Sequence, residues 1–197
     1  MTHFDSIEAL FEQNNGILKT SQALEKGVPK PVFYDYVRLR NVEQVAHGVY
    51  ATDDAWPDSM YLIHLRCAQA VFSHDSALYL HGLTTREPAL QCVTVKTGYN
   101  PSNLQANGLK VYTIKKSLHS VGLTKVATTF GNLVPVYDPE RTICDVIRSR
   151  NGIEAQVFQE ALKMYASMKG KNLGRLAEYA RMFHVEKLLR QYLEVLL

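Results

Sequence analysis

SIEALFEQNNGILKTSQALEKGVPKPVFYDYVRLRNVEQVAHGVYAT, residues 6–52, contains three short helical patterns followed by a hairpin pattern. Asp5 or Ser6 is suited to cap a first helix. Apolar residues then recur at helical spacing until the Asn-Asn-Gly run at 14–16 ends the pattern. The stretch therefore begins with one short amphipathic helix.

Two further helices follow in quick succession. Thr20 and Ser21 carry hydroxyls that suit the start of a second helix, and Gly27 marks the turn after it. Pro29 fits the first position of a third helix because its φ angle is already close to the helical value. The third helix has an inward stripe and an outward face, formed respectively by Phe33, Tyr36 and Val37 and by Lys30, Tyr34, Asp35 and Arg38.

A β-hairpin pattern closes the stretch. Apolar residues alternate from Val42 to Tyr50, and Gly48 supplies the backbone freedom that a tight turn requires. Two helices joined by a turn, a third helix and a hairpin follow the order of a winged helix-turn-helix. We therefore predict a DNA-binding domain of this kind over residues 1–53.

In a helix-turn-helix the second helix of the pair enters the major groove by its N-terminal end, where Lys30 and Tyr34 would contact bases. Hydroxyls and cations beside it would contact phosphates. The predicted DNA-binding residues lie on the second helix, the third helix and the hairpin: Lys19, Thr20, Ser21, Lys30, Tyr34, Arg38, Arg40 and His47.

The charge of this domain complicates the prediction. Residues 1–53 hold five Lys and Arg against seven Asp and Glu residues, although three of these acids lie at or near the first helix, which can face away from DNA. The remaining surface is mildly basic. Winged helices also serve as protein–protein modules, so that alternative stays open.

Composition indicates a globular chain without a membrane span. The 197 residues are 46% hydrophobic, and no apolar run approaches the roughly twenty residues that a bilayer requires. The N-terminus lacks the pattern of a secretory signal, so we expect a cytoplasmic protein. Cys67, Cys92 and Cys144 are widely spaced among apolar residues, which favours buried reduced thiols over a disulfide or zinc site. We expect no cofactor and no metal.

A second domain is predicted over residues 54–197, after polar residues interrupt the apolar pattern near 52–59. Short strands and one helix come first, and helices take over from Asp138. The expected class is α+β, with a small mixed sheet and a helical C-terminal segment. The expected elements are a helix or strand at 60–66, a brief apolar step at 70–72, a helix at 73–82, strands at 90–96, 110–115, 124–130 and 132–137, and helices at 139–150, 153–168, 173–183 and 185–196.

Three ordered blocks carry a family resemblance: VAHGVY at 45–50, SHDSALYLHGL at 73–83 and DPERTICDVIR at 138–148. Together they resemble the AbiEi-type antitoxins of bacterial abortive-infection systems. The resemblance covers the chain to at least Arg150. It implies a winged helix that binds inverted repeats in its own promoter, and a second domain that neutralises a co-encoded nucleotidyltransferase-like toxin. In these type IV toxin–antitoxin systems the two proteins are thought not to form a stable complex.

The residues of the second and third blocks favour structural roles. Glu140, Arg141 and Asp145 lie in one helix, where a capped start and local ion pairs, including Glu140 with Arg141, are the simplest explanation. His74, Asp75 and Ser76 are consecutive and so point in different directions on a helix. We therefore predict no catalytic triad, and no nucleotide-binding motif is visible.

A second patch of positive charge lies near the C-terminus. Residues 141–197 hold ten Lys and Arg against six acidic residues, and Lys169, Lys171 and Arg175 cluster around Gly170. A solvated helical face explains such a pattern, and so does contact with nucleic acid. A DNA footprint made of the first domain and this patch would reconcile an acidic first domain with tight binding.

The sequence thus predicts a non-enzymatic antitoxin that represses its own promoter, with double-stranded DNA and a co-encoded toxin as partners. Two alternatives stay open. One is a winged-helix regulator whose second domain senses a ligand or dimerises, without an antitoxin role. The other is a second domain that modifies the toxin or its target covalently.

Overall fold

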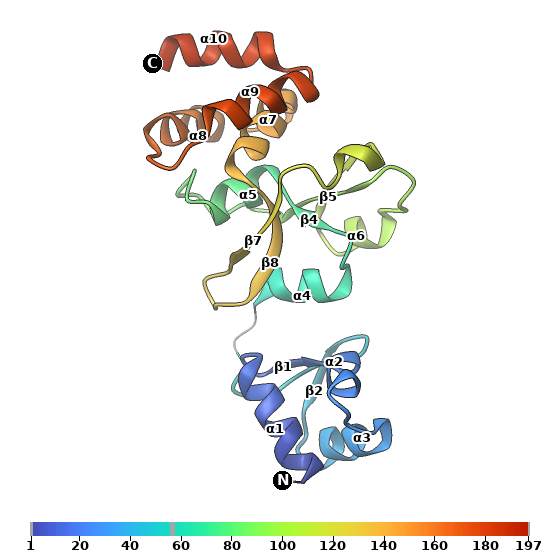
Figure 1. The fold of residues 1–197 in the computed structure, drawn as a ribbon. Coiled ribbons are helices and arrows are strands. Elements are labelled where there is room, and N and C mark those ends of the chain that lie inside the picture. Colours follow the sequence, from blue (N-terminus) through green and yellow to red (C-terminus); the bar gives the residue numbers. More distant parts are fainter. Residues whose placement is uncertain (1, 56–57, 197) are drawn as a thin grey trace. The chain divides into compact units, whose positions relative to one another are not determined.

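The computed structural model describes residues 2–55 and 58–196, the last four of them by their backbone alone. The chain divides into two compact units, one of Met1–Ala68 with Thr128–Asn132 and the other of Gln69–Ala127 with Leu133–Leu197. Both units combine helices with a sheet, and the chain ends in helices (Figure 1). This confirms the predicted α+β class.

The first unit begins with three helices and three short strands. In chain order these are α1 (His3–Gln13), β1 (Ile17–Lys19), α2 (Thr20–Glu25), α3 (Lys30–Leu39), β2 (Glu43–Ala46) and β3 (Val49–Ala51). The strands form an antiparallel sheet in the order β1-β3-β2. The hairpin turns at Gly48, whose φ of +66° fits the freedom expected of that glycine.

The starts of α1 and α2 differ from the prediction. Thr2, not Asp5 or Ser6, caps α1: its hydroxyl accepts the Asp5 N–H, and the Asp5 carboxylate accepts the Thr2 N–H. This is a reciprocal capping box, in which Asp5 is the third helical residue. Helix α2 has no side-chain cap from Thr20 or Ser21, which already lie inside it.

Strand β1 was not predicted. Its three residues are too few for a periodic signal, and they form a strand because Ile17, Leu18 and Lys19 pair with β3. Pairing buries Ile17 and Leu18 almost completely. A segment whose hydrogen-bond partners lie thirty or more residues away is difficult to recognise from local pattern alone.

The first core lies where α1, α3 and the hairpin meet. Ile7 and Phe11 from α1, Phe33 and Tyr36 from α3 and Tyr50 from β3 are buried there. The rings of Phe11 and Tyr36 stack with centroids 6.0 Å apart. The predicted inward stripe of the third helix is therefore confirmed for Phe33 and Tyr36, while Val37 is only partly buried.

Helix α4 (Ser59–Arg66) settles the open choice between helix and strand for this segment. Asp58 caps it by accepting the Tyr61 N–H. The other carboxylate oxygen of Asp58 accepts hydrogen bonds from Thr128 and Asn132, in the turn of a distant hairpin. These bonds explain why residues 128–132 group with the first unit.

The second unit contains a five-stranded sheet in the order β6-β5-β4-β8-β7. Two pairings are parallel and two are antiparallel, which confirms a mixed sheet. The strands and the two helices between them are β4 (Val71–Phe72), α5 (His74–Leu80), β5 (Cys92–Lys96), α6 (Ser102–Ala106), β6 (Lys110–Ile114), β7 (Leu123–Ala127) and β8 (Leu133–Tyr137). Helix α6 was not predicted.

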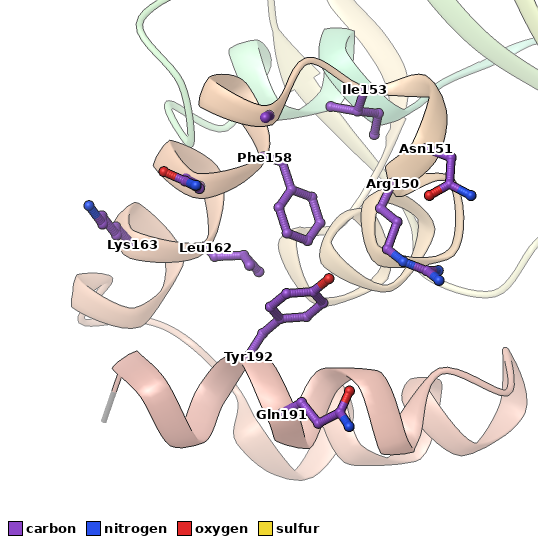
Figure 2. Close-up of a pocket in the computed structure, with 10 residues that line it drawn as sticks. Arg150, Asn151, Ile153, Phe158, Leu162, Lys163, Gln191 and Tyr192 are labelled. Atoms are coloured by element: carbon purple, nitrogen blue, oxygen red, sulfur yellow. The ribbon is translucent and has the colours of Figure 1, made fainter.

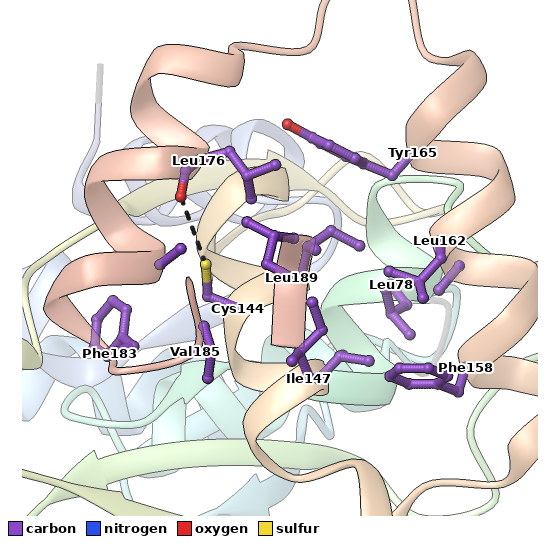
Figure 3. Close-up of a cluster of buried hydrophobic side chains, with 14 of the residues drawn as sticks. Leu78, Cys144, Ile147, Phe158, Leu162, Tyr165, Leu176, Phe183, Val185 and Leu189 are labelled. Carbon is purple, nitrogen blue, oxygen red and sulfur yellow. Dashed lines mark hydrogen bonds between the residues drawn. The ribbon is translucent and has the colours of Figure 1, made fainter. Parts of the chain in front are cut away.

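Four helices follow the sheet: α7 (Pro139–Arg148), α8 (Ala155–Ser167), α9 (Leu173–Met182) and α10 (Glu186–Leu196). They match the four predicted helices within a few residues at each end. Their apolar faces meet around Cys144 and Ile147 of α7, with Leu162, Leu176 and Leu189 from the other three helices (Figure 3). No helix among the described residues is long and apolar enough to cross a membrane.

Candidate nucleic-acid interface

Helix α3 presents one stripe of residues to solvent. Lys30, Tyr34 and Arg38 are spaced four residues apart, so they share one face of the helix, and all three are exposed. Phe33 and Tyr36 occupy the opposite side, in the core. The predicted division of this helix into an inward and an outward face is therefore confirmed.

The start of α3 suits a negatively charged partner. The helix has no acidic residue in its first turn and no side chain that caps it, and Pro29 is its N-cap residue rather than its first helical residue. The first N–H groups of a helix and its dipole together favour anions such as phosphate. Lys30, at the first helical position, adds a full positive charge.

Tyr34 is held in place by neighbouring rings. Its centroid lies 5.8 Å from Phe33 and 6.3 Å from Tyr50 of the hairpin, both in edge-to-face geometry. The Lys30 ammonium lies 6.0 Å from the Tyr34 ring. Burial is the main cause that raises the pKa of Tyr50, and the nearby Tyr34 is the second. Tyr50 therefore keeps its hydroxyl proton. An aromatic side chain that is 41% exposed is thus fixed beside a lysine.

The start of α2 is bonded to the hairpin. The Thr20 N–H donates to the Gly48 carbonyl at 2.9 Å, and the Thr20 hydroxyl donates to the same oxygen at 3.4 Å. The Lys19 N–H donates to the side chain of Gln22. The predicted phosphate donors therefore differ in availability: Ser21 is exposed, whereas the Thr20 hydroxyl joins two elements.

The remaining predicted DNA-binding residues are exposed. His47 lies in the hairpin turn, next to Gly48. The Arg38 guanidinium pairs with Asp35 at 2.8 Å, and Arg40 lies 4.0 Å from Glu8 of α1. Exposed pairs of this kind contribute about 0–1 kcal/mol, so a phosphate can replace either carboxylate at low cost.

The predicted C-terminal patch is less free than its charge suggests. The Lys171 ammonium donates to the carbonyls of Ala166 and Met168, where it caps the end of α8. Arg175 lies 3.7 Å from the Asp138 carboxylate. Lys169 is exposed. Two of the three predicted cations therefore already have partners within the second unit.

Helix α7 buries the polar residues of the third sequence block. Arg141 donates to the Asp145 carboxylate at 2.9 Å, and these side chains are only 0% and 1% exposed. The predicted pairing of Arg141 with Glu140 is wrong. Glu140 instead accepts hydrogen bonds from the Tyr165 hydroxyl and the Asn172 N–H. The interpretation as a capped helix with structural ion pairs accounts for these contacts.

In the second sequence block, His74 and Asp75 each have their own contacts. His74 stacks on Tyr112 with ring centroids 3.4 Å apart, and its two ring nitrogens lie within hydrogen-bond distance of the hydroxyls of Ser73 and Ser149. Burial lowers the pKa of His74 well below its ordinary value of 6.5. Asp75 instead lies beside the Cys92 thiol, so His74 and Asp75 have separate partners.

The three cysteines are buried, as predicted. Burial raises the pKa of Cys92 to about 11 and that of Cys144 to about 12. Both thiols therefore stay protonated near neutral pH, and protonated thiols are poor nucleophiles. The Cys144 thiol points towards the Leu176 carbonyl at 4.0 Å (Figure 3).

Comparison with known proteins shows the fold alone. No model of a known protein family matches the chain, and no curated protein matches it. The crystal structure of the RV2827C protein from Mycobacterium tuberculosis is similar, with a TM-score of 0.56 and 14% sequence identity. The match covers 92% of this chain and 72% of that chain, so the likeness extends over both units.

Proposed function

We propose that the first unit contains a winged helix-turn-helix that binds double-stranded DNA, with α3 as the recognition helix. The observation that carries the proposal is the exposed stripe of Lys30, Tyr34 and Arg38 on a helix joined to the hairpin through Tyr34 and Tyr50. In this arrangement the hairpin is the wing, and His47 at its tip meets the flanking backbone.

The proposed biological role is that of an autorepressor and antitoxin of a type IV system. The resemblance of three ordered sequence blocks to AbiEi-type antitoxins supports this role. The DNA site would be an inverted repeat in the protein's own promoter, with one copy of the chain on each half-site. The toxin would be nucleotidyltransferase-like and neutralised without a stable complex, in the bacterial cytoplasm where the promoter lies.

The DNA-binding proposal is tested with a double variant of the full chain, Lys30→Ala with Arg38→Ala. Loss of a base contact costs about 1–3 kcal/mol, so promoter affinity should fall at least tenfold. Lys115→Ala with Lys125→Ala is the matched control, because both lysines are exposed in the second unit. If the first double variant binds the promoter as tightly as the control, the proposed interface is wrong.

The antitoxin proposal is tested by co-expression with the neighbouring gene. The Lys30→Ala, Arg38→Ala variant should still rescue growth while it no longer represses the promoter, because the proposed roles lie in different units. Failure of the unaltered chain to rescue would overturn the antitoxin role. Promoter binding without rescue would favour a plain transcriptional regulator.

A second candidate function is that of a regulator whose second unit senses a ligand. A cavity of 690 Å³ within the C-terminal helices favours it. Cavities of about 300–1,000 Å³ are typical of sites for small molecules. This candidate keeps the proposed DNA-binding role of α3 and replaces the toxin by a small molecule as the second partner.

A further inference from the structure

The cavity lies between the turn at Arg150–Gly152, helix α8 and helix α10 (Figure 2). Its walls come from segments of the second unit only, so its shape does not depend on the first unit. Five of its ten lining residues are apolar or aromatic, namely Ile153, Ala155, Phe158, Leu162 and Tyr192. The other five lining residues are polar or charged, so the cavity offers both an apolar surface and hydrogen-bonding groups to a small molecule.

The apolar part of the lining is fixed by packing. Phe158 of α8 and Tyr192 of α10 meet edge to face, with ring centroids 5.0 Å apart and an interplanar angle of 72°. Phe158 and Leu162 are buried at 9% and 3% exposure, and Ile153 is buried beside them. Figure 2 shows the Phe158 ring next to the Tyr192 ring. These rings offer a surface for an aromatic or aliphatic body.

The polar part of the lining carries positive charge. Arg150 and Lys163 are among the ten lining residues, and none of the ten is acidic. Asn151, Gln159 and Gln191 add amide groups. Within the described part of the chain neither cation has an ion pair, and Arg150 has one long hydrogen bond, 3.4 Å to the Ile147 carbonyl. The guanidinium is therefore available to an anion.

We propose that this cavity binds a small organic anion, an aromatic carboxylate being the class that its lining fits. The aromatic body would lie against Phe158 and Tyr192, and the carboxylate would accept hydrogen bonds from Arg150, whose planar fork matches two carboxylate oxygens. Lys163 adds a second, more exposed positive charge. Binding at this site is measured without DNA, so this proposal and the DNA-binding proposal fail separately.

The first test measures binding to the full chain by titration calorimetry, with 2-naphthoate as the probe and 2-naphthalenemethanol as its neutral counterpart. The two probes share the ring system and differ in charge. The proposal expects saturable one-site binding of naphthoate and at least about tenfold weaker binding of the alcohol. Absence of naphthoate binding, or equal affinity for both probes, would overturn it.

Three full-chain variants locate the site. Arg150→Gln should weaken naphthoate binding about tenfold while leaving the affinity for the alcohol unchanged. Ala155→Trp should weaken binding of both probes, because Ala155 is an exposed lining residue and the added indole occupies part of the cavity. Arg181→Gln, an exposed cation of α9 outside the lining, is the matched control and should bind naphthoate like the unaltered chain.

The outcomes of the variants are decisive in both directions. If Ala155→Trp binds naphthoate with unchanged affinity, the probe occupies another place and the assigned site is wrong. If Arg150→Gln and Arg181→Gln weaken binding equally, the effect is one of net charge and the role assigned to Arg150 is overturned. A loss confined to Arg150→Gln and Ala155→Trp supports the site.

Discussion

Helices α3 and α7 invite direct comparison because each has ten residues, a proline near its start and an ion pair between neighbouring turns. In α3 the pair is Arg38 with Asp35, whose side chains are 78% and 54% exposed. In α7 it is Arg141 with Asp145, at 0% and 1%. The same local chemistry therefore leaves one arginine available to a partner and makes the other part of the core.

The burial of Arg141 is compensated by its surroundings. Its Nη1 atom donates to the carbonyls of Leu118 and Val121, while Nε donates to Asp145. The guanidinium carbon lies 4.2 Å from the Tyr137 ring centroid and 3.9 Å from that of Phe183. Burial raises the pKa of Asp145, and the charge of Arg141 opposes the rise. A group this enclosed contributes to structure and is inaccessible to DNA.

Removing the buried arginine should have the largest effect. Arg141→Met removes the nearer ion partner of the buried Asp145, leaving it Arg148 at 3.7 Å, and leaves two carbonyls without their donor, so the free energy of unfolding should fall by about 3–5 kcal/mol. Urea denaturation measures it. Arg38→Met is the matched variant in α3 and should change stability by less than about 1 kcal/mol. Equal losses in the two variants would remove the contrast between the helices.

The backbone beside Arg141 provides a second test. A Cβ atom on Gly122 would lie 2.6 Å from the Arg141 Cβ, and the φ of Gly122 is +74°. Gly122→Ala should therefore cost about 2–4 kcal/mol, from strain and displacement of Arg141 together. Gly82→Ala is the matched control, since its φ is +63° with open space around the new atom. The control should cost about 1 kcal/mol, and an equal cost at Gly122 would mean that the close approach is unimportant.

The pH dependence of stability tests the burial of His74. Because burial lowers the pKa of His74 in the folded state, the unfolded chain takes up a proton below pH 6.5 that the folded chain refuses. Stability should fall by up to about 1.4 kcal/mol per pH unit as the pH drops below that value. His74→Asn should reduce this slope, and asparagine tolerates the φ of +50° at this position. An unchanged slope in urea denaturation series would contradict the assignment.

Local pattern predicted the elements whose signal lies within a few residues. The inward and outward faces of α3 follow from helical spacing, and the hairpin turn follows from Gly48 between alternating apolar residues. The burial of the three cysteines follows from their apolar neighbours. The α+β class was predictable for the same reason, because strand and helix patterns occupy separate stretches of the chain.

Features that depend on distant residues were not predictable. Strand β1 exists through its pairing with β3. The cap of α1 is instead a local feature, whose signal is the spacing of Thr2 and Asp5. The count of positive charges over residues 141–197 included Arg141. In the structure this side chain is fully buried, because carbonyls and rings from other segments surround it. Likewise Lys171 and Arg175 have partners that spacing alone does not indicate.

A substitution in the exposed Arg38–Asp35 pair of α3 should change the affinity for DNA and leave the stability of the fold nearly unchanged. Asp35→Asn removes the carboxylate that holds Arg38 and one negative charge from the proposed DNA face. Promoter affinity should rise about three- to tenfold at low salt, while the free energy of unfolding changes by less than about 0.5 kcal/mol. Glu25→Gln, at the far end of α2, controls for net charge. An equal rise in both variants would show that Asp35 has no special position.

The C-terminal patch should show the smallest effect. Each phosphate contact contributes about 0.9 to the slope of log affinity against log salt, so three free cations would contribute nearly 3. Lys171 already caps α8 and Arg175 already lies beside Asp138. We therefore expect that neutralising Lys169, Lys171 and Arg175 together reduces the slope of log affinity against log salt by at most about 1. This change is the contribution of Lys169.

Lys169→Gln alone distinguishes the two explanations for this patch. If Lys169 contacts a phosphate, the single variant should reproduce the whole change in slope seen for the triple variant. The reason is that the Lys171 ammonium and the Arg175 guanidinium already have partners within the second unit. A slope identical to that of the unaltered chain would place all of the DNA contact in the first unit. A fall of nearly 3 in the triple variant would instead require Lys171 and Arg175 to leave their partners on binding, as the exposed Arg38 can and the buried Arg141 cannot.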